Sequence, residues 1–143
     1  MKKNEEKKIA VFGVFDGLHP GHLDFFKQAK NHGKKLVAIV AKDAAVKRLK
    51  NKTPAANEEK RVAEVASLKE VDEAVLGDDT EGEYEVLKII APDAICLGYD
   101  QNWLARDLAK KIESGFLSEI ELIRLKPYHP EKFKSSLLNG KNK

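Results

Sequence analysis

The sequence predicts an α/β fold: a single domain built on a five-stranded parallel sheet with helices on both faces. Short apolar segments of strand length alternate along the chain with segments whose apolar residues recur at helical spacing. Glycine and proline separate these segments, and neither an internal repeat nor a linker interrupts them. Strands that alternate with helices form parallel sheets joined by right-handed crossovers.

Each expected element follows from its local pattern. The strands are the apolar runs at residues 8–15, 35–43, 72–78, 93–99 and 119–125. The helices are the segments between and after them, at residues 22–33, 44–50, 57–68, 83–91, 102–115 and 129–140. Gly33 and Pro92 favour the ends of the first and fourth helices.

Length and composition narrow the class of protein. A chain of 143 residues with 42% hydrophobic residues fits one domain, 1–143, in which we expect 1–7 and 139–143 to be flexible. The net charge of +3 suits anionic small ligands, and the lysines are scattered among glutamates rather than gathered in a nucleic-acid-binding stripe. One cysteine, Cys96 in an apolar run, excludes an intramolecular disulfide framework. No segment approaches the ~20 apolar residues of a membrane helix, so we expect a cytoplasmic protein without membrane contact.

The predicted topology also places the functional site. Parallel sheets of this type bind ligands beyond the carboxyl ends of their strands, where the strand order reverses. The loops that leave these ends are expected at residues 16–22, 47–54 and 97–103. We therefore expect the residues of the functional site in these three loops.

The first loop sets two histidines, His19 and His22, three residues apart in the turn DGLHPGH. A zinc site would need further ligands, but the other histidines, at positions 32 and 129, have no motif spacing around them. A purely structural turn explains the two glycines and the proline, but not the two imidazoles. Phosphate binding explains both features, because His22 falls in the first turn of a helix, where free N–H groups favour anions.

The stretch GVFDGLHPGH resembles the H-x-G-H signature of the cytidylyltransferase-like nucleotidyltransferases, a family with a Rossmann-like domain. The strand, the motif residues and the helix come in the order of that family. The resemblance extends to the basic loop in KNKTPAANEEKR, to LGYDQNW after the fourth strand, and to FKSSLL near the carboxyl end. The segment KSSLLNGK departs from the family's usual pattern of a Ser/Thr pair followed by a basic and an aliphatic residue.

The resemblance implies roles for individual residues. The catalytic residues it implies are His19, His22, Lys50 and Arg61. Nucleotide-binding residues would be Gly13, Val14, Phe15, Asp16, His19, His22, Lys52, Gly98, Asp100, Ser135 and Ser136, and acceptor-binding residues Lys69, Tyr99 and Arg124. It implies no dedicated metal site, although Asp16 is a possible ligand for the divalent cation, such as Mg²⁺, that accompanies the nucleotide. Ordinary readings stand beside these roles: a solvated lysine loop, a structural arginine, a surface lysine and a helix cap at the two serines.

The resemblance also implies an activity. Enzymes of this family join an NTP to a phosphorylated acceptor and release pyrophosphate. The segments VAKDAAVKRLKNKTP and LGYDQNW are most similar to those of archaeal-type FAD synthases, which transfer AMP from ATP to FMN. A glycerol-3-phosphate cytidylyltransferase, or an enzyme acting on another polyol or sugar phosphate with CTP, is the alternative, and a non-catalytic nucleotide-binding module is the alternative of another class. Relatives are often homodimers, so we expect one here.

Overall fold

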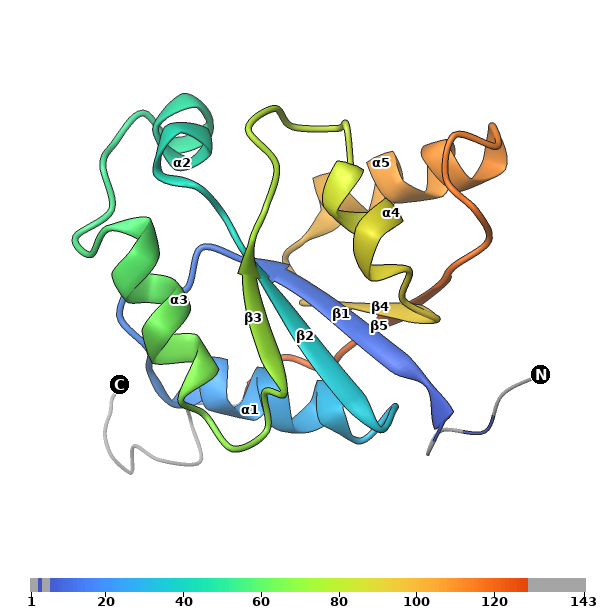
Figure 1. Ribbon diagram of the computed structural model, residues 1–143, viewed down its shortest axis with the longest axis horizontal. Coiled ribbons are helices and arrows are strands. Elements are labelled where there is room, and N and C mark those ends of the chain that lie inside the picture. Colours follow the sequence, from blue (N-terminus) through green and yellow to red (C-terminus); the bar gives the residue numbers. More distant parts are fainter. Residues whose placement is uncertain (1–2, 4–5, 129–143) are drawn as a thin grey trace.

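The computed structural model describes residue 3 and residues 6–128 (Figure 1). The strands are β1 (Lys8–Gly13), β2 (Lys35–Val40), β3 (Glu73–Leu76), β4 (Ala94–Leu97) and β5 (Glu121–Arg124). The helices are α1 (Pro20–Lys30), α2 (Asp43–Lys50), α3 (Glu58–Ala66), α4 (Glu85–Ile90) and α5 (Asn102–Glu113). The expected helix at 129–140 lies outside the described residues.

The strands form one parallel sheet in the order β3-β2-β1-β4-β5, which confirms the predicted fold class. The strand order reverses between β1 and β4. β1 pairs with β2 over six residues, but with β4 over only two, Ile9 with Ala94 and Ala10 with Ile95. Beyond Ala10 the two central strands therefore separate, and the space between their carboxyl ends opens.

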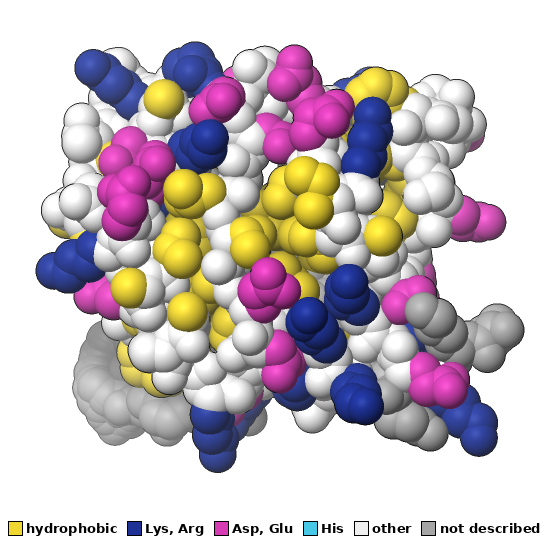
Figure 2. Space-filling view, viewed as in Figure 1, with side chains coloured by type: hydrophobic (Ala, Val, Ile, Leu, Met, Phe, Trp, Pro, Cys, Tyr) yellow, Lys and Arg dark blue, Asp and Glu magenta, His cyan; other side chains and the backbone are white. Residues whose placement is uncertain are grey.

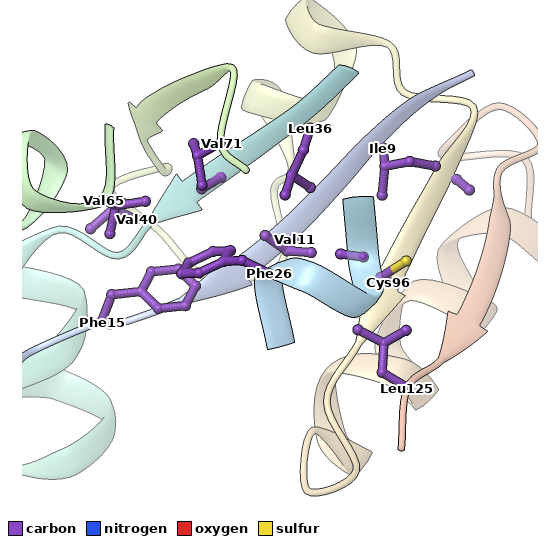
Figure 3. Packing of buried hydrophobic residues seen from close by; sticks show 13 residues of the cluster. Ile9, Val11, Phe15, Phe26, Leu36, Val40, Val65, Val71, Cys96 and Leu125 are labelled. Atoms are coloured by element: carbon purple, nitrogen blue, oxygen red, sulfur yellow. The ribbon is translucent and has the colours of Figure 1, made fainter. Parts of the chain in front are cut away.

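Successive side chains of β1 point to opposite faces of the sheet and pack into two separate hydrophobic cores. Ile9 and Val11 pack on one face, with Phe26 of α1 and Val65 of α3 (Figure 3). Ala10 packs on the other face, in a cluster with side chains of α4 and α5. Helices thus cover both faces of the sheet, as the buried apolar strands require.

Cys96 lies in the first of these cores and is fully buried (Figure 3). Burial raises the pKa of its thiol to about 12, so the group stays protonated near neutral pH. A protonated buried thiol behaves as a small apolar side chain. Cys96 is therefore a core residue, as its apolar run predicts.

The strands and helices end close to their expected positions, with one informative difference. The first strand ends at Gly13 rather than at residue 15, because Phe15 adopts a left-handed backbone conformation with φ of 55°. This conformation turns the chain away from the sheet and starts the helix at Pro20, two residues earlier than expected. No helix in residues 6–128 has the length and apolar character needed to cross a membrane.

Candidate active site

A cleft of about 930 Å³ opens at the carboxyl ends of the strands, where the strand order reverses. The loops after all five strands contribute to its lining. Figure 2 shows hydrophobic side chains gathered near the centre of one face, over β3 and α4, with charged side chains around the margins. Among the cleft's own lining, Tyr99 and Trp103 are large apolar side chains that are more than half exposed.

The two histidines form the start of α1 at the edge of the cleft. His19 is the N-cap, and its Nδ1 accepts a hydrogen bond of 3.1 Å from the backbone N–H of Gly21. Nδ1 of His22 accepts one of 3.3 Å from the backbone N–H of His19. The two side chains thus make a reciprocal capping box, in a position usually filled by Ser or Thr with Glu or Gln.

This cap determines which nitrogen of each ring carries the proton. A neutral imidazole has one donor and one acceptor nitrogen, and in His19 and His22 the acceptor is Nδ1. Each Nε2 therefore carries the hydrogen and takes no part in the cap. The rings stack with centroids 3.8 Å apart, so both Nε2–H groups belong to one compact unit.

The protonation state of His22 follows from its surroundings. Burial of the ring, followed by the charge of His19, lowers the pKa of His22 below its usual value. His22 is therefore neutral at physiological pH. The first N–H groups of α1 are already bound, that of Gly21 by Nδ1 of His19 and those of His22 and Leu23 by the His19 carbonyl, so the ring Nε2–H groups are the donors that this helix start offers to phosphate oxygens.

The packing of Phe15 against its neighbours explains the conformation of the turn that leads to the histidines. The Phe15 ring packs edge-on against His22, at a centroid distance of 5.7 Å, and also against Phe26 in the core. A Cβ atom on Gly13 would lie 2.5 Å from that ring, so Gly13 is the residue that lets Phe15 fold back. Gly13, Val14 and Phe15 all line the cleft, and their binding of a nucleotide stays a prediction.

Asp16 joins the opening turn to the loop that precedes α3. Its two carboxylate oxygens accept hydrogen bonds of 2.7 Å and 3.0 Å from the backbone N–H groups of Ala55 and Ala56. These two bonds are the main cause of the lowered pKa of Asp16, to which Arg61 and Lys52 add a smaller effect. This geometry gives Asp16 a structural role in holding the basic loop beside the histidines.

Arg61 does not occupy the position predicted for a catalytic residue, and we correct that prediction. Its side chain is fully buried and does not line the cleft. The guanidinium donates to the carbonyls of Val14, Ala41 and Ala56, and pairs with the carboxylate of Asp43. Because the side chain is fully buried and four of its five N–H donors bind these partners, Arg61 does not face the cleft; instead it ties together three loops that surround the cleft.

The two lysines of the basic loop lie where the sequence places them. Lys50 ends α2 and Lys52 follows it, and both line the cleft with exposed side chains. Two neighbouring cations are engaged elsewhere: Lys42, which precedes α2, pairs with Asp79, and Arg48 of α2 pairs with Glu81. Within residues 6–128, Lys50 and Lys52 make no ion pair, which leaves them able to meet an anionic ligand.

The loop after β4 contributes Gly98, Tyr99 and Asp100 to the cleft. Gln101 holds this loop: its Oε1 accepts from the Gly98 N–H at 2.8 Å, and its Nε2 donates to the Phe12 carbonyl at 2.9 Å. The side chain of Gln101 therefore bridges the ends of β1 and β4, which no longer pair with each other at this level.

Two predicted acceptor-binding residues lie away from the cleft. Lys69 is an exposed residue of the turn between α3 and β3, at the amino end of the sheet and so at the opposite edge, which corrects that prediction. Arg124 is also absent from the lining; it donates to the Tyr99 carbonyl at 3.1 Å and to the Asn102 side chain at 2.9 Å. It therefore supports the loop after β4 rather than meeting a ligand directly. Ser135 and Ser136 lie outside the described residues.

Sequence reasoning missed two parts of the lining. The loop after β3 brings Asp78, Thr80 and Glu81 to the cleft, and the segment after β5 brings Lys126 and Tyr128. The signal that finds them is general: in a parallel sheet the loop after every strand leaves at the same edge. Neither segment carries a motif, so pattern recognition alone passes over them.

The described residues do not fit a metal site made of protein ligands. In residue 3 and residues 6–128, no group of three or more His, Cys, Asp or Glu side chains is placed to hold a metal ion. The best candidate, Asp16, already uses both carboxylate oxygens to bind backbone N–H groups. A divalent cation in this cleft would need the oxygens of a bound ligand.

The strand order and the cleft are those of a Rossmann-like domain, a fold in which ligands bind where the strand order reverses. Comparison with known proteins then identifies the family. The model of the cytidylyltransferase-like family matches residues 10–136, and the chain belongs to this family of nucleotidyltransferases.

Relatives and solved structures agree with that assignment. A FAD synthase of Pyrococcus abyssi is 41% identical over 128 residues, covering 90% of this chain and 85% of the relative. A FAD synthase of Aciduliprofundum boonei is 41% identical over 138 residues, covering 95% and 86%. Among solved structures, a lipopolysaccharide core biosynthesis protein from Thermoplasma volcanium has a TM-score of 0.77 and 34% identity, covering 86% of this chain and 98% of its own.

Proposed function

We propose that the protein transfers AMP from ATP to FMN, giving FAD and pyrophosphate. An oxygen of the FMN phosphate attacks the α-phosphorus of ATP, and the bond from that phosphorus to the bridging β-phosphate oxygen breaks. The electron pair of the broken bond leaves with pyrophosphate, and no covalent intermediate with the enzyme is needed. The task of the protein is therefore alignment of the two phosphates and stabilisation of the charge that grows on them.

The observation that carries the nucleotidyl-transfer part is the stacked histidine cap. It directs two Nε2–H donors from the start of α1, at the lip of a cleft that also carries two exposed lysines. The choice of FMN and ATP rests on the FAD synthases that are 37–43% identical to this chain. The exposed rings of Tyr99 and Trp103 offer surfaces on which a flavin or a base can stack.

Residue roles follow from this proposal. His19 and His22 bind the α-phosphate as it is transferred, and Lys50 and Lys52 bind the other phosphates of ATP as point charges. Gly98 and Asp100 contact the nucleotide from the loop after β4. Mg²⁺ would enter bound to the phosphates of ATP, because the cleft offers it no cluster of protein ligands. A cytoplasmic location and a homodimer remain predictions.

The test is a matrix of donors and acceptors read by pyrophosphate release. ATP and CTP are each combined with FMN, glycerol 3-phosphate and a sugar phosphate, in the presence of Mg²⁺. We expect FAD from ATP and FMN, with CTP poorer by about tenfold or more, because an unpaired polar group left by the wrong base costs about 1–3 kcal/mol. Efficient use of CTP with glycerol 3-phosphate, and no FAD, would replace the flavin assignment and keep the nucleotidyltransferase one.

A further inference from the structure

The segment that leaves β5 is held by a side chain of α1. The last sheet-like hydrogen bond of this segment runs from the Leu125 N–H to the Leu97 carbonyl, at 2.8 Å. The next residue, Lys126, has both its backbone N–H and its backbone carbonyl bound by Gln28. Oε1 of Gln28 accepts from the Lys126 N–H at 2.9 Å, and its Nε2 donates to the Lys126 carbonyl at 2.9 Å.

A third partner fixes the orientation of the Gln28 amide. Nε2 also donates to the carboxylate of Asp24, one helical turn earlier, at 2.8 Å. If the amide were flipped, its oxygen would face the Asp24 carboxylate and the Lys126 carbonyl, both acceptors, and its NH₂ would face a donor. The amide therefore has one satisfied orientation, and it redirects the chain from the end of β5 towards α1.

The clamp that Gln28 forms on the backbone of Lys126 determines which residues after β5 line the cleft. Lys126 and Tyr128, the two residues on either side of Pro127, line the cleft. The Tyr128 ring lies 3.8 Å from the place that a Cβ on Gly21 would occupy, so this segment reaches the histidine turn. Lys126 is exposed and makes no ion pair within residues 6–128. It is thus a cation that faces the cleft from the side opposite Lys50 and Lys52 in the strand order.

We propose that Gln28 is a positioning residue, which holds the backbone N–H and carbonyl of Lys126 so that the Lys126 ammonium meets a phosphate group of a bound substrate. The phosphate belongs either to the nucleotide or to the phosphorylated acceptor. This inference rests on the proposed nucleotidyl transfer. Because Gln28 acts through Lys126, its contribution to binding disappears when the ammonium is absent.

The test is a double-mutant cycle on the full chain, with Gln28→Ala, Lys126→Ala and the combined variant. Lys27→Ala, an exposed cation on the same helix, is the matched control. Calorimetry measures the binding of MgATP and of FMN separately, and steady-state kinetics give KM and kcat. Lys126→Ala should weaken one of the two ligands by about tenfold, equal to about 1.4 kcal/mol, and Gln28→Ala should weaken the same ligand by a smaller factor.

The combined variant decides between positioning and a merely structural role. Positioning predicts that it binds no more weakly than Lys126→Ala alone, and that Lys27→Ala binds like the wild type. Independent losses that multiply in the combined variant, or unchanged affinity for both ligands in Lys126→Ala, would overturn the proposal.

A readout without catalysis completes the test. Hydrogen exchange of the Lys126 amide should be faster in Gln28→Ala than in the control, because its acceptor is gone. Unchanged exchange would show that the clamp is absent in solution and overturn the proposal. If the wild type makes no FAD, the assignment of FMN fails, but MgATP binding and amide exchange still judge the role of Gln28.

Discussion

The rings of His19 and His22 lie stacked with centroids 3.8 Å apart, and each ring caps the helix start through its Nδ1. One pair of side chains therefore does two tasks that substitutions can separate. The Nδ1 atoms stabilise the helix, and the Nε2–H groups remain for a ligand.

Replacement of His19 tests this separation. Asn is a favourable N-cap, so His19→Asn keeps a cap acceptor and loses the Nε2–H donor. We expect kcat to fall by about 10²-fold or more, with a thermal midpoint close to that of the wild type. His19→Ala should lose a comparable amount of activity and also about 1 kcal/mol of stability. Steady-state kinetics and thermal unfolding measure the two effects, and near wild-type turnover in His19→Asn would refute the phosphate-binding role.

The titration of His22 is a second prediction. Burial lowers its pKa, so its ring should titrate below the ordinary value of about 6.5. The unfolded chain then takes up the proton first as the pH falls, so the protein loses stability below about pH 6.5 until the folded-state pKa is passed. In His22→Gln, which keeps a side-chain acceptor for the capping box, this part of the pH dependence should vanish. NMR titration of the ring proton and unfolding at several pH values provide the check; a pKa at or above 6.5 would contradict the burial argument.

The basic loop gives a third prediction. Replacing Lys50 and Lys52 together by Ala should weaken MgATP binding by about tenfold or more, because each removes a point charge from the phosphates. Stability should stay within about 0.5 kcal/mol of the wild type, since exposed lysines contribute little to folding. Lys69→Ala, on the opposite edge of the sheet, is the control and should bind normally. Unchanged affinity in the double variant would mean that the loop is merely solvated.

Arg61 should behave differently from these lysines. Arg61→Lys keeps the charge but cannot make the forked set of bonds to three carbonyls and a carboxylate. We expect a loss of about 2–4 kcal/mol in unfolding free energy, measured by denaturant titration, because buried carbonyls lose their partners. Activity per folded molecule should fall less than in the His19 variants. A fully stable but inactive Arg61→Lys would instead restore a direct catalytic role.

The sequence patterns were sufficient to predict the parallel sheet and the turn that carries His19 and His22. The strands are apolar runs with clear punctuation, and the motif around His19 carries its own strand, turn and helix start. The structural role of Arg61 could not be predicted from the sequence. Its partners are backbone carbonyls of three separate loops, and every residue type has such a carbonyl. The position of Lys69 was misjudged for a related reason: whether a residue near a helix end faces the cleft depends on which edge of the sheet the helix runs towards.

The contribution of the segment after β5 was equally hidden. Gln28 binds the backbone N–H and carbonyl of a residue 98 positions away, and these backbone groups are the same whatever side chain the residue carries. Contacts of this kind depend on the relative placement of α1 and β5, which is set by packing in the core. Only the three-dimensional arrangement reveals them.

The short pairing of β1 with β4 has a mechanical consequence. Six paired residues bind β1 to β2, but two bind it to β4, with the Gln101 side chain as a further tie. The sheet is therefore made of a three-stranded part, β3-β2-β1, and a two-stranded part, β4-β5, which are joined by the short pairing of β1 with β4. At this junction the histidine turn, which follows β1, lies beside the loop that follows β4. The distance between these loops is therefore set across the junction with the fewest paired residues in the sheet, two against four or more at every other junction.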